Sequence, residues 1–145
     1  MTQLLPDPDL SAEERGRYAR HLTLPEFGVS GQQRLKTASV LCVGAGGLGS
    51  PLLLYLAAAG VGRIGIVDDD CVEVSNLQRQ VIHAEGGLGE PKTGSARRRL
   101  LGLNSHCLVE EHACRLTKAN AVELIESHDV VVDGSDNFPT RYLIN

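Results

Sequence analysis

The sequence lacks the features that place a protein in a membrane, carry it across one or attach it to nucleic acid. No apolar run approaches the roughly 18–20 residues that span a bilayer, and Met1–Ser11 has no basic region followed by an apolar one, as a secretory signal would. Basic residues are in the minority, with 14 Lys and Arg against 18 Asp and Glu and a net charge of −4. This balance argues against general affinity for nucleic acid. We expect a cytoplasmic protein that binds neither membranes nor nucleic acid.

The sequence also lacks paired cysteines. Its four cysteines are Cys42, Cys71, Cys107 and Cys114, and no two form a C-x-x-C pair, so no zinc site is expected within this chain. Cys42 and Cys107 have apolar neighbours and are expected in the core. Cys71 follows three aspartates, whose charges disfavour a thiolate. We therefore assign no catalytic cysteine.

The most informative stretch is a glycine cluster that follows a short apolar run. Val40–Val43 shows no polar alternation, which predicts a strand buried on both faces, as in a parallel sheet. The cluster consists of Gly44, Gly46, Gly47 and Gly49, and the apolar segment 50–60 after it predicts a helix that ends at a glycine cap. Such a turn presents backbone N–H groups and a helix N-terminus to a phosphate. A glycine-rich turn without a ligand is the alternative, but the flanking strand and helix favour nucleotide binding.

Strands and helices alternate along the chain after this unit. Strands are expected at 63–67, 107–112 and 129–133, and helices at 91–102, at 119–127 and from 139 onward. The first and last of these strands are apolar enough to be buried, whereas the middle one has polar flanks and is expected near an edge. The predicted fold is α/β, a Rossmann-like parallel β-sheet with helices on both faces.

The segment before the sheet, residues 1–38, is expected to form a helical arm. Ser11 and Glu14 are spaced as the capping box of a helix at 12–21, and a short helix at 31–37 follows a loop. The nucleotide-binding domain is then expected at 39–145. Because the chain stops inside a predicted helix, we expect it to be the N-terminal part of a longer protein, truncated before the C-terminal half of the domain.

Charged residues follow two of the predicted strands, where open α/β sheets bind their ligands. Asp68 comes about 20 residues after the glycines and is assigned to a ribose hydroxyl, while Asp70 could contribute there or cap the next segment. Asp136 could hold a Mg²⁺ that bridges phosphates, or cap the next helix, and one local geometry can serve both roles. Pro91 is expected as the first residue of the helix at 91–102, and Lys92 in its first turn opposes the helix dipole, which is explained if Lys92 contacts a phosphate; an ordinary surface lysine is the alternative.

Several separated motifs together resemble one family. They are Arg17–His21, Val43–Gly49, Asp68–Asp70, Ser75–Gln80 with the sequence Ser-Asn-Leu-Gln-Arg-Gln, Gly89–Lys92 and Asp133–Asn137. In this combination the chain resembles the E1-like superfamily of ubiquitin-activating enzymes, in its small bacterial form, over nearly its whole length. Within that superfamily it is most similar to the adenylyltransferases of molybdenum cofactor biosynthesis, with those of thiamine biosynthesis as near relatives.

The resemblance implies a reaction. ATP, with Mg²⁺, and the C-terminal glycine carboxylate of a small ubiquitin-like sulfur-carrier protein ending in Gly-Gly form an acyl-adenylate, and pyrophosphate leaves. Nucleotidyl transfer of this kind needs mainly positioning and charge neutralisation. The family carries a zinc site of two C-x-x-C pairs in its C-terminal half, so zinc is implied only where that half and its cysteine pairs are present.

The resemblance also implies site residues. The catalytic ones are Arg20, Arg79, Lys92 and Asp136. Those that bind the nucleotide are Gly44, Gly46, Gly47, Gly49, Asp68, Asp70, Ser75, Asn76, Leu77, Gln78, Arg79, Lys92, Asp136 and Asn137, with Asp136 as the Mg²⁺ ligand. Arg20 resembles an arginine finger that enters the site of the neighbouring subunit, where a lysine could not replace it, and this implies a homodimer.

Two other interpretations use the same residues. An NAD-dependent oxidoreductase would use the glycines and Asp68, but it gives no role to Arg79, Lys92 and Asp136, three charges that suit a triphosphate and its metal. A non-catalytic scaffold would bind a nucleotide or a ubiquitin-like tail without exchanging pyrophosphate. The adenylyltransferase interpretation accounts for more of the motifs than either.

Overall fold

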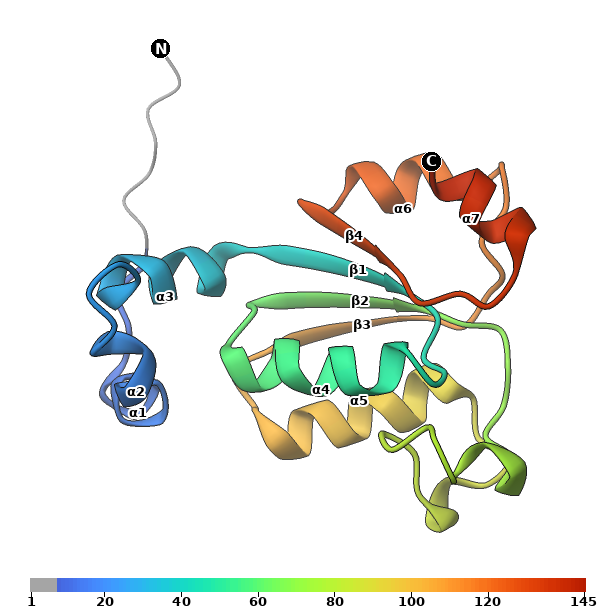
Figure 1. Ribbon diagram of the computed structural model, residues 1–145, viewed down its shortest axis with the longest axis horizontal. Coiled ribbons are helices and arrows are strands. Elements are labelled where there is room, and N and C mark those ends of the chain that lie inside the picture. Colours follow the sequence, from blue (N-terminus) through green and yellow to red (C-terminus); the bar gives the residue numbers. More distant parts are fainter. Residues whose placement is uncertain (1–7) are drawn as a thin grey trace.

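The structure, a computed structural model, describes residues 8–145, and within them four parallel strands form one sheet (Figure 1). The strands are β1 (Ser39–Val43), β2 (Arg63–Val67), β3 (Leu108–His112) and β4 (Val130–Asp133), in the order β3-β2-β1-β4. Each neighbouring pair is parallel. The predicted Rossmann-like parallel sheet is confirmed, and β3 lies at an edge as expected.

Helices cover both faces of this sheet, as predicted. The helices α4 (Gly49–Ala59) and α5 (Lys92–Leu103) lie against one face, and α6 (Ala121–Glu126) and α7 (Phe138–Ile144) lie on the other (Figure 1). Successive residues of β1 point to opposite faces, so Cys42 joins the buried cluster under α4 and α5, and Leu41 joins the one under α6. Cys107 is also buried, as expected. None of the helices in residues 8–145 is long and apolar enough to cross a membrane.

The carboxyl ends of β1, β2 and β4 lie level with one another. Val43 at the end of β1 pairs with Val67 on one side and with Asp133 on the other. Because α4 begins at Gly49, soon after β1, its N-terminus lies at the same end of the sheet as the carboxyl ends of these strands. The helix ends at Gly60, whose φ of 92° is the left-handed conformation that glycine adopts readily, so the predicted glycine cap is confirmed.

From residue 8 onward, three helices precede the sheet and lie at the end where its strands begin (Figure 1). They are α1 (Ala12–Arg17), α2 (Ala19–Leu22) and α3 (Gly28–Thr37). Ser11 and Glu14 form the predicted capping box. The expected single helix at 12–21 is wrong, because the chain turns at Tyr18, whose buried hydroxyl accepts a hydrogen bond from Asn104 at 2.8 Å. Residues 1–7 of the predicted arm lie outside the described residues.

Two further expectations are corrected. The strand β4 was expected to be buried, but Val130 is half-exposed, because within the described residues β4 pairs only with β1 and forms an edge. The helix α5 begins at Lys92, and Pro91, the expected first residue, is its N-cap with an extended ψ of 135°. Between β2 and α5 the chain forms two 3₁₀ turns, η1 (Val74–Asn76) and η2 (Glu85–Gly87).

Candidate functional site

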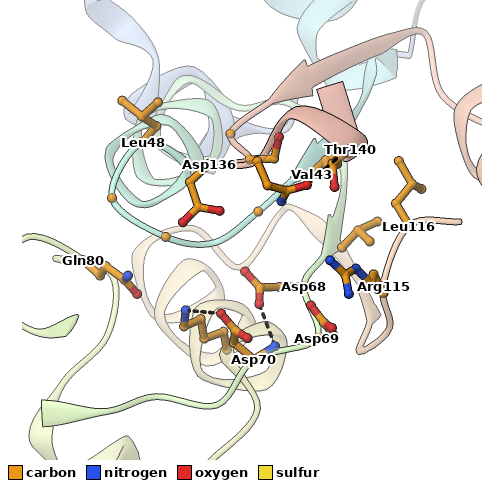
Figure 2. A pocket seen from close by; sticks show the side chains of 18 of the residues that line it. Val43, Leu48, Asp68, Asp69, Asp70, Gln80, Arg115, Leu116, Asp136 and Thr140 are labelled. Atoms are coloured by element: carbon orange, nitrogen blue, oxygen red, sulfur yellow. Dashed lines mark hydrogen bonds and ion pairs between the residues drawn. The ribbon is translucent and has the colours of Figure 1, made fainter. Parts of the chain in front are cut away.

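A cavity of about 770 Å³ opens at the carboxyl ends of the strands (Figure 2). Its walls come from the ends of β1 and β2, the glycine turn, the segment after β3, and the turn and helix after β4. Ligands of open α/β sheets bind at this place. The lining residues with charged, amide or hydroxyl side chains are Asp68, Asp69, Asp70, Arg79, Gln80, Lys92, Arg115, Ser135, Asp136, Asn137, Thr140 and Arg141.

At Gly44 and Gly49 the glycine turn packs backbone against backbone and leaves no room for a side chain. A Cβ atom on Gly49 would lie 1.9 Å from the carbonyl oxygen of Gly44, and a Cβ atom on Gly44 would lie 2.8 Å from that of Gly134. Gly44 also has a φ of 99°. These close approaches join the turn after β1 to the turn after β4. Gly44, Gly46 and Gly47 line the cavity, whereas Gly49 is buried behind them.

The N-terminus of α4 faces the same space without a side-chain cap. Its N-cap is Leu48, whose side chain makes no capping hydrogen bond and which itself lines the cavity. The first N–H groups of an α-helix have no partner within the helix, and the helix dipole adds positive potential there. The end of this 11-residue helix is therefore suited to a negatively charged group.

Asp68 binds the backbone at the edge of the cavity. Its Oδ2 atom accepts a hydrogen bond from the N–H of Ala45 at 2.8 Å, and its Oδ1 atom accepts one from the N–H of Asp70 at 2.9 Å. Each carboxylate oxygen keeps a second lone pair, so Asp68 can still accept a hydrogen bond from a ligand hydroxyl. The carboxylates of Asp68, Asp69 and Asp70 each place an oxygen within 4.8 Å of the others.

Lys92 is a buried cation on the floor of the cavity. The residue is 5% exposed, and its Nζ atom donates to Oδ2 of Asp70 at 3.0 Å. The alternative of an ordinary surface lysine is therefore wrong. The side chain of Asp70 is 67% exposed and can turn into water, which would free the ammonium group for a bound anion. A buried charge with one exchangeable partner is typical of a ligand site and unusual as a stabilising device.

The sequence left two roles open for Asp136, a ligand of Mg²⁺ and the N-cap of the following helix, and the structure gives the second of them to Asn137. Asn137 is the N-cap of α7 and accepts a hydrogen bond from the N–H of Thr140 at 3.0 Å, so the cap is not Asp136. The exposed carboxylate of Asp136 points into the cavity in Figure 2, with no interaction drawn to the other lining residues. Asp136 is thus available to a ligand or a cation.

The structure does not bring every expected residue to the cavity. Ser75, Asn76, Leu77 and Gln78 do not line it. They form η1 and the turn after it, where the side chain of Asn76 accepts a hydrogen bond from the N–H of Glu73 at 3.1 Å. Arg79 does reach the cavity, and its Nη1 atom donates to the carbonyl of Ser75 at 3.3 Å. This motif therefore positions Arg79.

Arg20 lies at the other end of the sheet from the cavity, where the strands begin (Figure 1). It is on α2 beside His21, whose ring nitrogen lies 2.8 Å from Oε1 of Gln32. Gln32 in turn donates to the carbonyl of Ala59, the last residue of α4. The 11-residue helix α4 is about 16 Å long and begins at the cavity. Arg20 is therefore separated from the cavity of its own chain by the length of that helix.

Several lining residues were missed by the sequence analysis as site residues. Gln80 was part of the Ser75–Gln80 motif, and it is 4% exposed with an Oε1 atom that has no partner among the described residues. Arg115 follows β3, where no motif marked the chain. Arg141 on α7 donates to the carbonyl of Ser135 at 3.2 Å and lines the cavity from the β4 side. Only the fold brings these two arginines to the lining of the cavity.

Burial controls the titration of two groups behind the glycine turn. It raises the pKa of the Cys42 thiol to about 12, with the charges of Asp68 and Asp133 adding to the effect. Burial lowers the pKa of His83, although the hydrogen bond to the carbonyl of Ala45 acts against this. Both groups are thus neutral near pH 7, and Cys42 is a core residue as expected.

Comparisons with known proteins agree with this geometry. The chain is 56% identical over 140 residues to the probable adenylyltransferase/sulfurtransferase MoeZ of Mycobacterium tuberculosis. This match covers 97% of this chain and 36% of MoeZ. It is 57% identical over 133 residues to the sulfur carrier protein adenylyltransferase of Thermus thermophilus. That match covers 92% of this chain and 49% of the Thermus protein. The chain thus spans less than half the length of these two relatives.

A solved structure shows the same fold. The E. coli tRNA N6-threonylcarbamoyladenosine dehydratase TcdA, in complex with ATP, superimposes with a TM-score of 0.87 and 27% sequence identity, over 92% of this chain and 55% of that one. The model of the ThiF family matches residues 18–145, from the buried Tyr18 through the glycine turn to the last helix. The chain belongs to the ThiF family.

Proposed function

We propose that this chain contains the nucleotide site of an ATP-dependent adenylyltransferase of molybdenum cofactor biosynthesis. Its substrate is the C-terminal glycine carboxylate of a small ubiquitin-like sulfur-carrier protein. The names of the relatives support this, since MoeZ and the Thermus protein are both described as adenylyltransferases. The ATP complex of TcdA supports a nucleotide in this fold.

One observation carries the proposal. The cavity joins an uncapped helix N-terminus and a glycine turn to the buried ammonium group of Lys92, with the guanidinium of Arg79 at its border. Backbone N–H groups and cations that converge in this way suit a polyphosphate. Asp68 stands at the end of β2, in the position that bonds a ribose hydroxyl. An NAD-dependent oxidoreductase would leave Lys92 and Asp136 without a role.

The residues act by holding charges in place. The carboxylate oxygen of the carrier attacks the α-phosphorus of ATP, the bond from that phosphorus to the bridging oxygen breaks, and pyrophosphate leaves with the electron pair. Lys92 and Arg79 stabilise the negative charge that builds on the phosphate oxygens, and they do so best in a site that excludes water. Asp136 supplies a free carboxylate of the kind that Mg²⁺ prefers, and would hold the ion, which neutralises phosphate charge when bound.

The remaining expected residues have supporting parts in this proposal. Gly44, Gly46 and Gly47 let the backbone approach the phosphates, and Gly49 lets α4 begin close to β1. Ser75–Gln78 carry Arg79 to the cavity, Asn137 holds the turn that presents Asp136, and Asp70 is the exchangeable partner of Lys92.

We also propose a homodimer in which Arg20 acts in trans. Support comes from its position, since Arg20 is exposed and lies at the far end of α4 from its own cavity. Arg20 is too far from the cavity of its own subunit to act there, but in a dimer it could reach the cavity of the other subunit. Its planar guanidinium would stabilise transition-state charge on two oxygens at once.

The proposal is tested by ATP–pyrophosphate exchange with the intact protein, with and without candidate carrier proteins that end in Gly-Gly. We expect exchange that depends on one carrier, which identifies the substrate at the same time. Exchange driven by a carrier of thiamine biosynthesis would move the protein to that pathway. Tight ATP binding without exchange for any carrier would indicate a scaffold, and binding of NAD in place of ATP would overturn the proposal.

A further inference from the structure

A buried histidine holds the middle of the glycine turn. The N–H of Ala45 donates to Asp68 at 2.8 Å, and its carbonyl oxygen lies 2.9 Å from Nε2 of His83. His83 is 7% exposed, precedes η2 and is not among the lining residues of the cavity. The Ala45 residue is thus fixed on both sides, and one of its two partners has no part in the proposed chemistry.

The hydrogen bonds determine the tautomer of His83. A carbonyl oxygen can only accept a hydrogen bond, so Nε2 carries a proton. The Nδ1 atom lies 2.9 Å from Oγ of Ser95, and in a neutral ring it accepts the hydroxyl proton. The ring is neutral because burial lowers the pKa of His83. The two hydrogen bonds therefore run in one direction: the hydroxyl of Ser95 donates to Nδ1 of His83, and Nε2 of His83 donates to the carbonyl of Ala45.

The carbonyl of Ala45 and the N–H of Gly46 belong to one planar peptide. In a trans peptide these two groups point in opposite directions. The carbonyl is held on the buried side by His83, while Gly46 lines the cavity. Within residues 8–145, no backbone hydrogen bond engages the N–H of Gly46. That donor is consequently turned toward the cavity and left free.

We propose that His83 is a positioning residue that fixes the orientation of the Ala45–Gly46 peptide, so that the Gly46 N–H donates to a phosphate oxygen of the bound nucleotide. This role rests on the proposed function, in which the cavity binds ATP. Without the donor at Nε2, the peptide can rotate and present the Ala45 carbonyl oxygen to the phosphates, where like partial charges repel.

The helix α5 takes part in this arrangement twice. Lys92 in its first turn faces the cavity, and Ser95 one turn later fixes the tautomer of His83. The cation and the orientation of the backbone donor are therefore set from one rigid element. Such support beneath the groups that contact the ligand is what keeps a binding site in its productive geometry.

Two amide substitutions separate this role from simple packing. In His83→Gln the amide nitrogen can take the place of Nε2 and donate to the Ala45 carbonyl, whereas in His83→Asn it takes the place of Nδ1 and cannot reach. Both lose the imidazole ring and should lower the thermal midpoint, and H83N should lower it further because it also leaves the buried Ala45 carbonyl without a donor. We expect the Kd for ATP, measured by calorimetry on the intact folded protein, to rise about tenfold in H83N and to stay within about threefold of wild type in H83Q.

The outcomes distinguish this inference from the proposed function. If wild type binds ATP and the Kd values of H83N and H83Q for ATP are equal to each other, the role of His83 is overturned while the proposed function stands. If wild type binds no ATP, both are overturned. Should H83N fail to fold, ¹⁵N NMR of wild type decides: we expect the imidazole proton of His83 on Nε2, and a proton on Nδ1 of a neutral ring would overturn the inference.

Discussion

The carbonyl oxygen of Gly134 lies 2.8 Å from the position that a Cβ atom on Gly44 would take, so the turns after β1 and β4 touch through their backbones. Gly44 also has a φ of 99°. A side chain there meets both a strained backbone and a collision with main-chain atoms. We expect Gly44→Ala to lower the free energy of unfolding by about 2–3 kcal/mol, measured by urea denaturation.

Gly102 is the matched control for this substitution. It lies near the end of α5, and a Cβ there would meet no atom within 4 Å among residues 8–145, apart from its chain neighbours and the backbone of its own helix. We expect Gly102→Ala to raise the free energy of unfolding by about 0.5 kcal/mol, because alanine restricts the unfolded chain and suits a helix. Equal losses in the two variants would show that the contact with Gly134 is not what makes Gly44 necessary.

Lys92 provides a test of charge within the cavity. Lys92→Met keeps most of the aliphatic side chain and removes the buried ammonium group, whose acidic partner Asp70 is mostly exposed. We expect pyrophosphate exchange to fall by about 100-fold, with the thermal midpoint unchanged or raised because a buried charge is costly. Lys118→Met, on an exposed loop residue, is the control and should leave exchange within about twofold of wild type. Exchange near the wild-type rate in K92M would remove Lys92 from the proposed mechanism.

Local patterns were sufficient to predict the parts of the site that depend on neighbouring residues. The glycine turn follows a buried strand and precedes a helix, and Gly49 meets the carbonyl of Gly44, a backbone atom that this local connection brings close. Asp68 and Asp136 were found because residues after parallel strands gather at one edge of the sheet. The prediction of the sheet itself rested on the apolar run at β1, which is buried throughout.

What the sequence could not predict depends on contacts between distant segments. Arg115 and Gln80 reach the cavity from segments 35 residues apart, and no spacing rule connects them. His83 binds Ala45, 38 residues away, so nothing in its own neighbourhood marks it. The exposure of Val130 was missed because an apolar run looks the same in a central strand and in an edge strand.

The cysteines should differ in reactivity. Burial and the nearby charges of Asp68 and Asp133 raise the pKa of Cys42 to about 12, so at pH 8 only about one thiol in ten thousand is ionised. Burial also raises the pKa of Cys107, whereas Cys71 is exposed. In the native protein we expect a thiol reagent at pH 8 to modify Cys71 and to reach Cys42 and Cys107 only after denaturant is added. Peptide mapping by mass spectrometry identifies the modified residues, and rapid native labelling of Cys42 would contradict its burial.

The start of β1 should contribute a pH-dependent term to stability. The carboxylate of Asp129 accepts two hydrogen bonds from Ser39, one from Oγ at 2.6 Å and one from the backbone N–H at 2.8 Å. These bonds lower the pKa of Asp129. A lowered pKa means that the contribution is present above the ordinary value of 3.8 and is lost as the pH falls through the lower folded value. In Ser39→Ala we expect the pKa of Asp129, followed by carbon NMR, to rise, and the stability difference from wild type to shrink below about pH 3. A difference that stays constant down to pH 2 would exclude this linkage.

Arg20 distinguishes a site completed in cis from one completed by a second subunit. Arg20→Ala should lower exchange by about 1000-fold, as the loss of an arginine finger does, while Arg34→Ala, an exposed arginine on α3, should have little effect. Arg20→Ala subunits keep Asp136, and Asp136→Ala subunits keep Arg20. If the proposed dimer forms at random from an equal mixture, half of the dimers are mixed, and each has one site with both residues. We therefore expect the mixture of two inactive variants to recover about a quarter of wild-type exchange. Confirmed mixed dimers without recovery would show that Arg20 does not act in trans.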